Sequence, residues 1–99
     1  MKNLIIHLNK AFENRIRLGV MSILMVHEWE DFTMLKDTLE VTDGNLASHI
    51  NALEKLKYLD VRKSFIGKKP NTSFAVSKEG RKAFQDHLTA LEALIKNKG

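Results

Sequence analysis

The sequence contains no cysteine. Disulfide bonds, thiolate metal sites and thiol redox switches are therefore excluded, and the composition fits a reducing compartment. The four histidines are scattered, without the i, i+4 or short-loop spacing typical of a metal site. We predict no metal and no cofactor.

Long apolar segments are also absent. The longest run, residues 18–26, is about half the length that spans a bilayer, and charge follows the first residues too soon for a secretory signal. No internal repeat, low-complexity segment or linker divides the 99 residues, a length sufficient for one hydrophobic core. We expect one soluble cytoplasmic domain over residues 1–99.

A recognisable catalytic arrangement is missing as well. An enzyme would need a nucleophile beside a base, a carboxylate pair or a phosphate-binding loop. The nearest candidate is the acidic group Glu28, Glu30 and Asp31. Three acidic side chains at the end of a helix are typical of a solvent-exposed surface. We therefore predict that the protein is not an enzyme.

Charge is unevenly distributed along the chain. Residues 55–82 contain nine basic and two acidic side chains, whereas residues 28–43 contain six acidic ones and a single lysine. Such segregation favours an oriented polyanionic partner over general solubility.

Residues 42–58 form the stretch around which the chain is organised. Thr42 or Asp43 can cap a helix, and an apolar stripe of helical period follows at Leu46, Ile50, Leu53 and Leu56. The opposite face is small and polar, then cationic, with Gly44, Asn45, Ser48, Asn51 and Lys55. Such side chains fit close approach to base edges, where Asn can pair with adenine. The alternative is an ordinary amphipathic helix.

Two helices are expected before this stretch. Residues 3–28 have helical character, with a possible break near residues 9–14. In the second part, Ile16, Val20, Ile23 and His27 line one face, and Leu18, Met21 and Met25 line the opposite one. A helix that is apolar on two sides is buried on both, so we infer that one side meets a second subunit. After a short extended link, Thr33 can cap a helix running to about Glu40. The short connection to Thr42 then makes a helix-turn-helix.

A β-hairpin is expected next, because the apolar period changes from 3.6 to 2 after Tyr58. Residues 61–66 and the return strand with Phe74 and Val76 flank a turn at residues 67–72, which carries Lys68 and Lys69 at its tip. Lysines also protect hairpin edges from aggregation, so the cations alone would be weak support for nucleic-acid binding. Directly after a helix-turn-helix, such a hairpin is a wing.

The last helix is predicted to begin after a Ser77 cap. Phe84, Leu88, Leu91 and Ile95 follow at heptad-like spacing. Together with Leu18, Met21 and Met25, they offer more apolar surface than one small core should need, which predicts a homodimer.

With this order of elements, the chain resembles the small stand-alone winged-helix transcriptional regulators of the MarR-like and ArsR-like type. Three stretches carry the resemblance: residues 14–24, residues 42–54, and residues 65–81 with the run Phe-Ile-Gly-Lys-Lys-Pro-Asn-Thr. The resemblance implies a dimeric, sequence-specific DNA-binding regulator. In one departure, Lys57 stands where such proteins often place a left-handed Gly. The ArsR-like metal sensors typically use cysteine ligands, which this chain lacks.

The predicted fold is mainly α with a small β-hairpin wing, in the order α-β-α-α-β-β-α. The predicted partners are double-stranded DNA with a palindromic operator, and a second copy of the chain. The predicted DNA-binding residues are Thr42, Asn45, Ser48, Asn51, Lys55, Arg62, Lys63, Lys68 and Lys69. The alternatives are a protein-interaction module without specific DNA binding, and an RNA-binding subunit.

Overall fold

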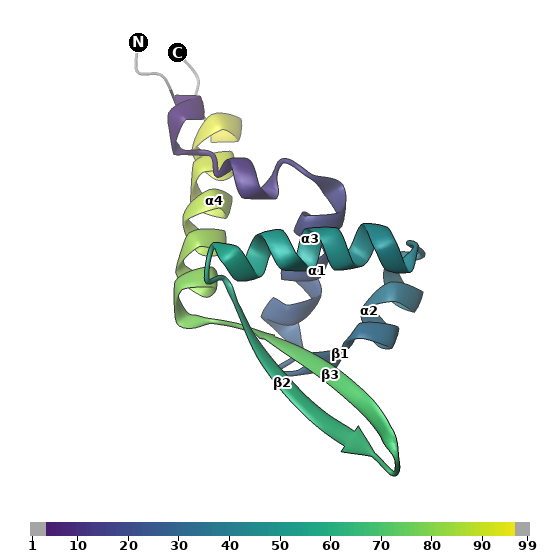
Figure 1. Ribbon diagram of the computed structural model, residues 1–99. Helices are drawn as coiled ribbons and strands as arrows, with labels where there is room; N and C mark the ends of the chain where they lie inside the picture. The colour runs from purple at the N-terminus through teal and green to yellow at the C-terminus, as the bar shows by residue number, and fades with distance from the viewer. Residues whose placement is uncertain (1–3, 97–99) are drawn as a thin grey trace.

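The chain forms a helical body from which a β-hairpin projects (Figure 1). The computed structural model describes residues 4–96. Its elements, in chain order, are the 3₁₀ helices η1 (Leu4–His7) and η2 (Lys10–Phe12), α1 (Arg15–Val26), β1 (Glu30–Asp31), α2 (Phe32–Leu39), α3 (Asp43–Lys55), β2 (Leu59–Ile66), β3 (Lys69–Val76) and α4 (Lys78–Lys96). The three strands within these residues form one antiparallel sheet in the order β1-β3-β2. The predicted winged helix-turn-helix is confirmed.

Of the helix predicted over residues 3–28, the part before α1 forms the two short 3₁₀ helices η1 and η2 in place of one longer helix. The predicted start of that helix lies outside the described residues. The Asn9 side chain accepts a hydrogen bond from the N–H of Ala11 at 2.9 Å, and the Asn14 side chain accepts two from the first turn of α1. Asn side chains bonded in this way begin new helices. The predicted break near residues 9–14 is therefore confirmed.

The core face of α1 consists of Val20, Met21 and Leu24, all of which are buried. Residues three and four apart share a helix face, so Met21 lies on the same side as Leu24. Leu18 and Met25 lie at the edges of this face, partly buried against the same core. The predicted division of α1 into two opposite apolar faces is therefore wrong.

α2 and α3 form the predicted helix-turn-helix. The N-cap of α2 is Asp31, whose carboxylate accepts the N–H of Met34 at 2.8 Å, so the prediction of a Thr33 cap is wrong. Of the two predicted candidates, Thr42 rather than Asp43 caps α3, since its hydroxyl accepts the N–H three residues further on.

α3 buries Leu46, Ile50 and Leu53 against the core. Leu56, predicted to extend this stripe, is exposed because the helix has already ended at residue 55. The end is formed by Lys57, whose φ of 65° is left-handed, and by a hydrogen bond from the N–H of residue 58 to the carbonyl of residue 53. This Schellman-type ending turns the chain sharply into β2.

The hairpin of β2 and β3 is longer, and its turn tighter, than predicted. Pairing continues to Ile66 opposite Lys69, which leaves a two-residue turn of Gly67 and Lys68 in place of the expected turn over residues 67–72. Gly67 supplies the left-handed φ of 64° that this turn requires. The ribbon consequently extends well beyond the helices (Figure 1).

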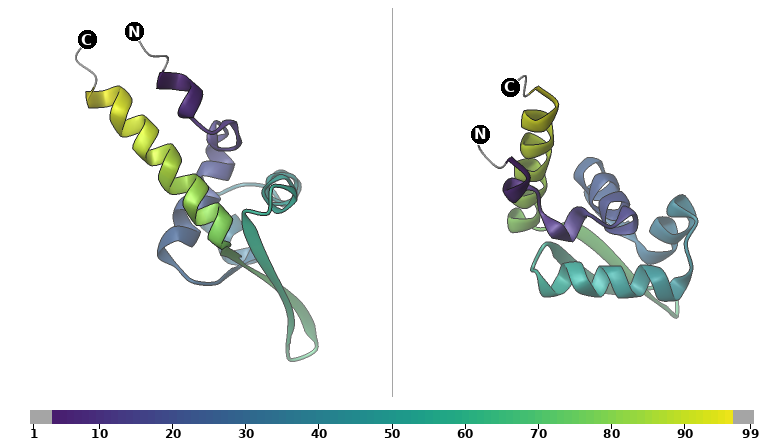
Figure 2. Two further views of the ribbon diagram at one scale, coloured as in Figure 1. Left: turned by 90° about the vertical axis from the view of Figure 1, so that its left-hand side faces the viewer. Right: turned by 90° about the horizontal axis from the view of Figure 1, so that it is seen from above.

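α4 begins at the predicted Ser77 cap, whose hydroxyl oxygen accepts the N–H of Gly80 at 2.9 Å and donates to the carbonyl of Lys57 at 2.6 Å. Its core face carries Phe84, His87 and Ala90. His87 Nδ1 accepts a hydrogen bond from the backbone N–H of residue 9 at 3.0 Å. The N-terminal segment is thereby attached to α4, and η1 lies alongside that helix (Figure 2).

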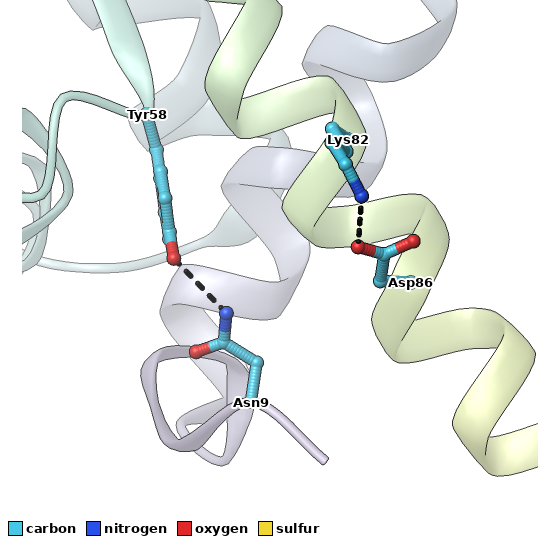
Figure 3. Close-up of polar contacts among 4 residues, drawn as sticks. All are labelled: Asn9, Tyr58, Lys82 and Asp86. Carbon is cyan, nitrogen blue, oxygen red and sulfur yellow. Dashed lines mark hydrogen bonds and ion pairs between the residues drawn. The ribbon is translucent and has the colours of Figure 1, made fainter. Parts of the chain in front are cut away.

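A second polar contact attaches this segment to the end of α3. The Asn9 side-chain amide donates to the Tyr58 hydroxyl at 3.1 Å, and Figure 3 shows the two side chains directed toward one another. The ion pair of Lys82 and Asp86, also drawn there, lies on the exposed side of α4. The contact of Asn9 with Tyr58 therefore links segments far apart in sequence, whereas the ion pair is local to one helix.

Two of the residues predicted at a dimer interface belong to the core of the single chain. Met21 is fully buried, and the Phe84 ring packs edge-on against Phe12 with 5.2 Å between centroids. Neither can meet a second subunit, so the prediction is wrong for both. Leu88, Leu91 and Ile95 do lie exposed on α4.

Candidate nucleic-acid interface

The outward face of α3 is polar and exposed. The Thr42 cap and the exposed residues of the first turn lie at one end of the helix, and Lys55 lies in its last turn. Between them, Asn45, Ser48 and Asn51 are exposed along the face that points away from the buried stripe. The side chains predicted on this helix therefore share one accessible surface.

Asp43, in the first turn of α3, forms an ion pair with Lys36 of α2 at 3.0 Å. The hydrogen bond to Asp43, together with the carboxylate charge, raises the pKa of the Lys36 ammonium. Lys36 partly neutralises the Asp43 carboxylate at the N-terminus of α3. The helix dipole makes this same end of the helix favourable for anions. The start of α3 is thus less repulsive to an approaching anion than the sequence suggests.

A hollow of about 400 Å³ lies between α3 and the hairpin. Its walls include Ile50 and Asn51 of α3, Thr33 at the start of α2, and Pro70 and Thr72 of β3. Asn51, on the outward face of α3, and one face of the hairpin therefore line the same concave surface, which we call the α3–hairpin hollow.

The strand register determines which cations share this surface. Lys63 is paired with Thr72, and directly paired residues of neighbouring strands project to the same face of a sheet. Lys63 is therefore on the face of the hollow, and Lys68 and Lys69 are exposed at the tip of the hairpin. Lys63 thus places positive charge beside the concave surface, and Lys68 and Lys69 add charge at the tip of the hairpin.

Arg62, the remaining predicted cation of the hairpin, contacts Trp29 and does not face the hollow. Its guanidinium lies over the Trp29 ring, 4.2 Å from the ring centroid. Because successive residues of a strand alternate between faces, Arg62 is on the face opposite Lys63. The structure separates Arg62 from the other predicted site residues and makes it a contact between the hairpin and the segment before β1.

Comparison with known families decides the identity of this arrangement. Residues 16–95 match the model of a winged-helix DNA-binding domain. The chain belongs to this winged-helix DNA-binding family. In its terms, α3 is the recognition helix and the hairpin of β2 and β3 is the wing. The family consists of DNA-binding domains of transcriptional regulators and not of enzymes.

Two of the similar proteins are about one third identical to this chain. The chain is 32% identical over 88 residues to an uncharacterized protein of Methanocaldococcus jannaschii, covering 89% of this chain and 96% of that one. A transcriptional regulator homologue from Pyrococcus horikoshii is 31% identical, with a TM-score of 0.75, covering 86% of this chain and 84% of that chain. An ArsR family transcriptional regulator shares the fold, with a TM-score of 0.59 and 19% identity over 91% of this chain and 88% of that chain.

Some members of the site were not predicted from the sequence. Pro70 and Thr72 line the α3–hairpin hollow, and Trp29 holds Arg62. Counting alternate residues back from the buried Phe74 would have placed Thr72 and Pro70 on its face. The contact of Trp29 with Arg62 gives no local signal, because it joins segments 33 residues apart.

The described part of the chain contains neither a cluster of metal ligands nor a membrane-spanning helix. Over residues 4–96, no three His, Asp or Glu side chains lie together as a metal site would require. Over the same residues, none of the helices has the length and apolar character to cross a bilayer.

Proposed function

We propose that this winged-helix protein is a sequence-specific regulator of transcription that binds duplex DNA as a homodimer in the cytoplasm. The recognition helix enters the major groove, and the wing lies on the backbone or in the minor groove. The observation that carries the proposal is the α3–hairpin hollow, where Asn51 of the polar face of α3 meets the face of the wing that carries Lys63.

Each part of this surface has a distinct role. Asn45, Ser48 and Asn51 read base edges, because short amide and hydroxyl groups can approach them closely. Phosphates are held by cations at both ends of the surface and by the Thr42 hydroxyl, which can still donate while it caps α3. The phosphate-binding cations are Lys55, Lys63, Lys68 and Lys69. Arg62 is assigned to the Trp29 contact instead.

The homodimer is built on the exposed apolar residues of α4, Leu88, Leu91 and Ile95. A two-fold axis through such a surface is the commonest arrangement of soluble oligomers. Two recognition helices fixed by this axis face successive major grooves. The operator is then a palindrome whose half-site centres lie about one helical turn, roughly 10 base pairs, apart.

DNA binding is tested by selecting bound sequences from random DNA and titrating the selected site at several salt concentrations. A dimer that engages roughly six to eight phosphates should give a slope of log K against log salt of about −5 to −7. Asn51→Ala should weaken binding to the selected site by about 1–3 kcal/mol and have much less effect on random DNA, since base contacts carry discrimination.

The matched control is the double variant Lys68→Ala/Lys69→Ala. It should flatten the salt slope by about 3 to 4 in a dimer and preserve the sequence preference. A parent slope near zero would contradict DNA binding and leave the protein-interaction module as the better interpretation. Equal losses for Asn51→Ala on both DNAs would contradict its role as a base reader.

A further inference from the structure

Two large apolar side chains are exposed to solvent near the tip of the wing. Phe65 is 72% exposed and Ile66 is 65% exposed. They immediately precede the turn of Gly67 and Lys68, at the end of the ribbon that lies farthest from the helices (Figure 1). Contact with phosphates requires only the lysines. The exposed ring therefore needs a different explanation.

The strand register directs Phe65 toward the surface proposed to meet DNA. Phe65 is paired with Pro70, so both project to the same face of the ribbon. Pro70 and Thr72 line the α3–hairpin hollow together with Asn51. Phe65 therefore extends the hollow toward the tip, whereas Ile66, its neighbour in the strand, projects to the opposite face.

The surroundings of Phe65 favour a nucleic acid over an apolar protein surface. Lys63 lies two residues before Phe65 on the same face, and Lys68 lies three residues after it, in the turn. Lys69 is paired with Ile66 and projects to the opposite face. Cations on both sides of an apolar side chain match the minor groove, where phosphates border the stacked bases. The base of the ribbon is also held in place, because Arg62 packs on Trp29.

We propose that Phe65 inserts between base pairs in the minor groove and kinks the DNA at the point where each wing contacts it. This inference rests on the proposed DNA-binding function and extends it. Apolar side chains such as Phe partly unstack a base step when they enter the minor groove, and bend the duplex toward the major groove.

The kink adds a sequence preference at positions that no polar side chain reads. Pyrimidine–purine steps such as TA and CA unstack most readily. Sites selected from random DNA should therefore be enriched in these steps on the outer flanks of the palindrome, where the wings lie.

The test compares the parent with Phe65→Ala and, as a matched control, Ile66→Ala. The Ile66 side chain has similar size and exposure but lies on the other face. Bending is measured by energy transfer between dyes on the two ends of the selected duplex. Unstacking is measured by the fluorescence of 2-aminopurine placed at the flanking step.

The parent and Ile66→Ala should shorten the end-to-end distance and increase the 2-aminopurine signal. Phe65→Ala should lose both effects and bind about tenfold more weakly, with the salt slope of the parent, since no charge is removed. Circular dichroism checks that each variant is folded.

Salt-dependent binding without a bend, or a bend that Phe65→Ala preserves, would overturn this inference alone. Loss of the bend in Ile66→Ala but not in Phe65→Ala would also overturn it. Absence of salt-dependent binding by the parent would overturn the inference and the proposed function together.

Discussion

Gly80 lies where the first turn of α4 meets the chain leaving α3. A Cβ atom at this position would overlap the carbonyl oxygen of Tyr58. That same oxygen accepts the N–H of Ser77 at 2.9 Å, so it cannot move away without breaking a hydrogen bond. The Gly is required by this close approach, since the residue lies inside a helix and needs no unusual φ.

Gly80→Ala should therefore destabilise the protein by about 2 kcal/mol or more, because the methyl group forces the backbone apart. Gly44→Ala is the matched control. A Cβ at Gly44 meets no atom within 4 Å, and Ala in a helix is favoured over Gly by about 0.5–1 kcal/mol. Urea denaturation at equal protein concentration measures both. Equal stability of the two variants would contradict the proposed contact.

Helix caps show how far single residues could be predicted from the sequence. Thr42 and Ser77 cap the helices assigned to them. Both could be predicted, because each stands directly before a clear apolar period and no other capping residue stands before it. Asp31 and Thr33 compete for one helix, and local sequence does not decide between them. The pairing of Asp31 with Ser73 in the sheet leaves Asp31 at the boundary, so it becomes the cap.

The alternation of apolar and polar residues predicts the two strands of the wing, but the turn between them is shorter than predicted. The sequence predicts Pro70 and Asn71 in the loop, because Pro and Asn are frequent in turns. In a hairpin closed by the hydrogen-bonded pair of Ile66 and Lys69, the next pair is not hydrogen-bonded, and the nitrogen of Pro70 faces outward. β1 pairs only with Ser73 and Phe74, so no strand needs an N–H from Pro70.

Contact with Trp29 changes the role assigned to Arg62. If Arg62 anchors the wing, Arg62→Ala should weaken DNA binding by about two- to fivefold, in line with the 0.5–1 kcal/mol of an exposed cation–π contact. The salt slope should stay that of the parent. The fluorescence of Trp29, the single tryptophan of the chain, should change in the absence of DNA.

Lys63→Ala is the control for this prediction, because Lys63 neighbours Arg62 on the opposite face. It should flatten the salt slope by about 2 in a dimer and leave the fluorescence of Trp29 unchanged. If Arg62→Ala flattens the slope as much as Lys63→Ala does, Arg62 contacts phosphates and the anchoring role is contradicted.

At the scale of the whole molecule, the sequence alone does not show which apolar residues of α1 and α4 lie in the core and which lie on the surface. Helical periodicity identified α1 and α4 as rich in apolar residues, but it could not show how one helix is rotated against the other. The core uses Met21 on α1 and Phe84 on α4. Of the residues predicted at a dimer interface, Leu88, Leu91 and Ile95 of α4 remain exposed, so the predicted interface is smaller than expected.

That remaining surface predicts the oligomeric state. Leu88, Leu91 and Ile95 are exposed on α4, and Ile5 and Ile6 are exposed on η1 beside it (Figure 2). Exposed apolar residues that gather in one place, rather than scatter singly, mark association surfaces. The end of α4 points away from the hairpin (Figure 1), so a dimer built here leaves the wing accessible.

The double variant Leu91→Glu/Ile95→Glu should convert the dimer to a monomer, because it places two like charges on each side of the two-fold axis. Val26→Glu is the matched control: Val26 is 81% exposed, close to the 83% of Ile95, but lies at the end of α1. Sedimentation measures the mass at micromolar concentration, and DNA titration measures the affinity. Loss of one linked half-site should weaken operator binding by about 10²–10⁴, whereas Val26→Glu should stay a dimer with parental affinity. A parent that sediments as a monomer would contradict the dimer, as would a preference for single half-sites over palindromes.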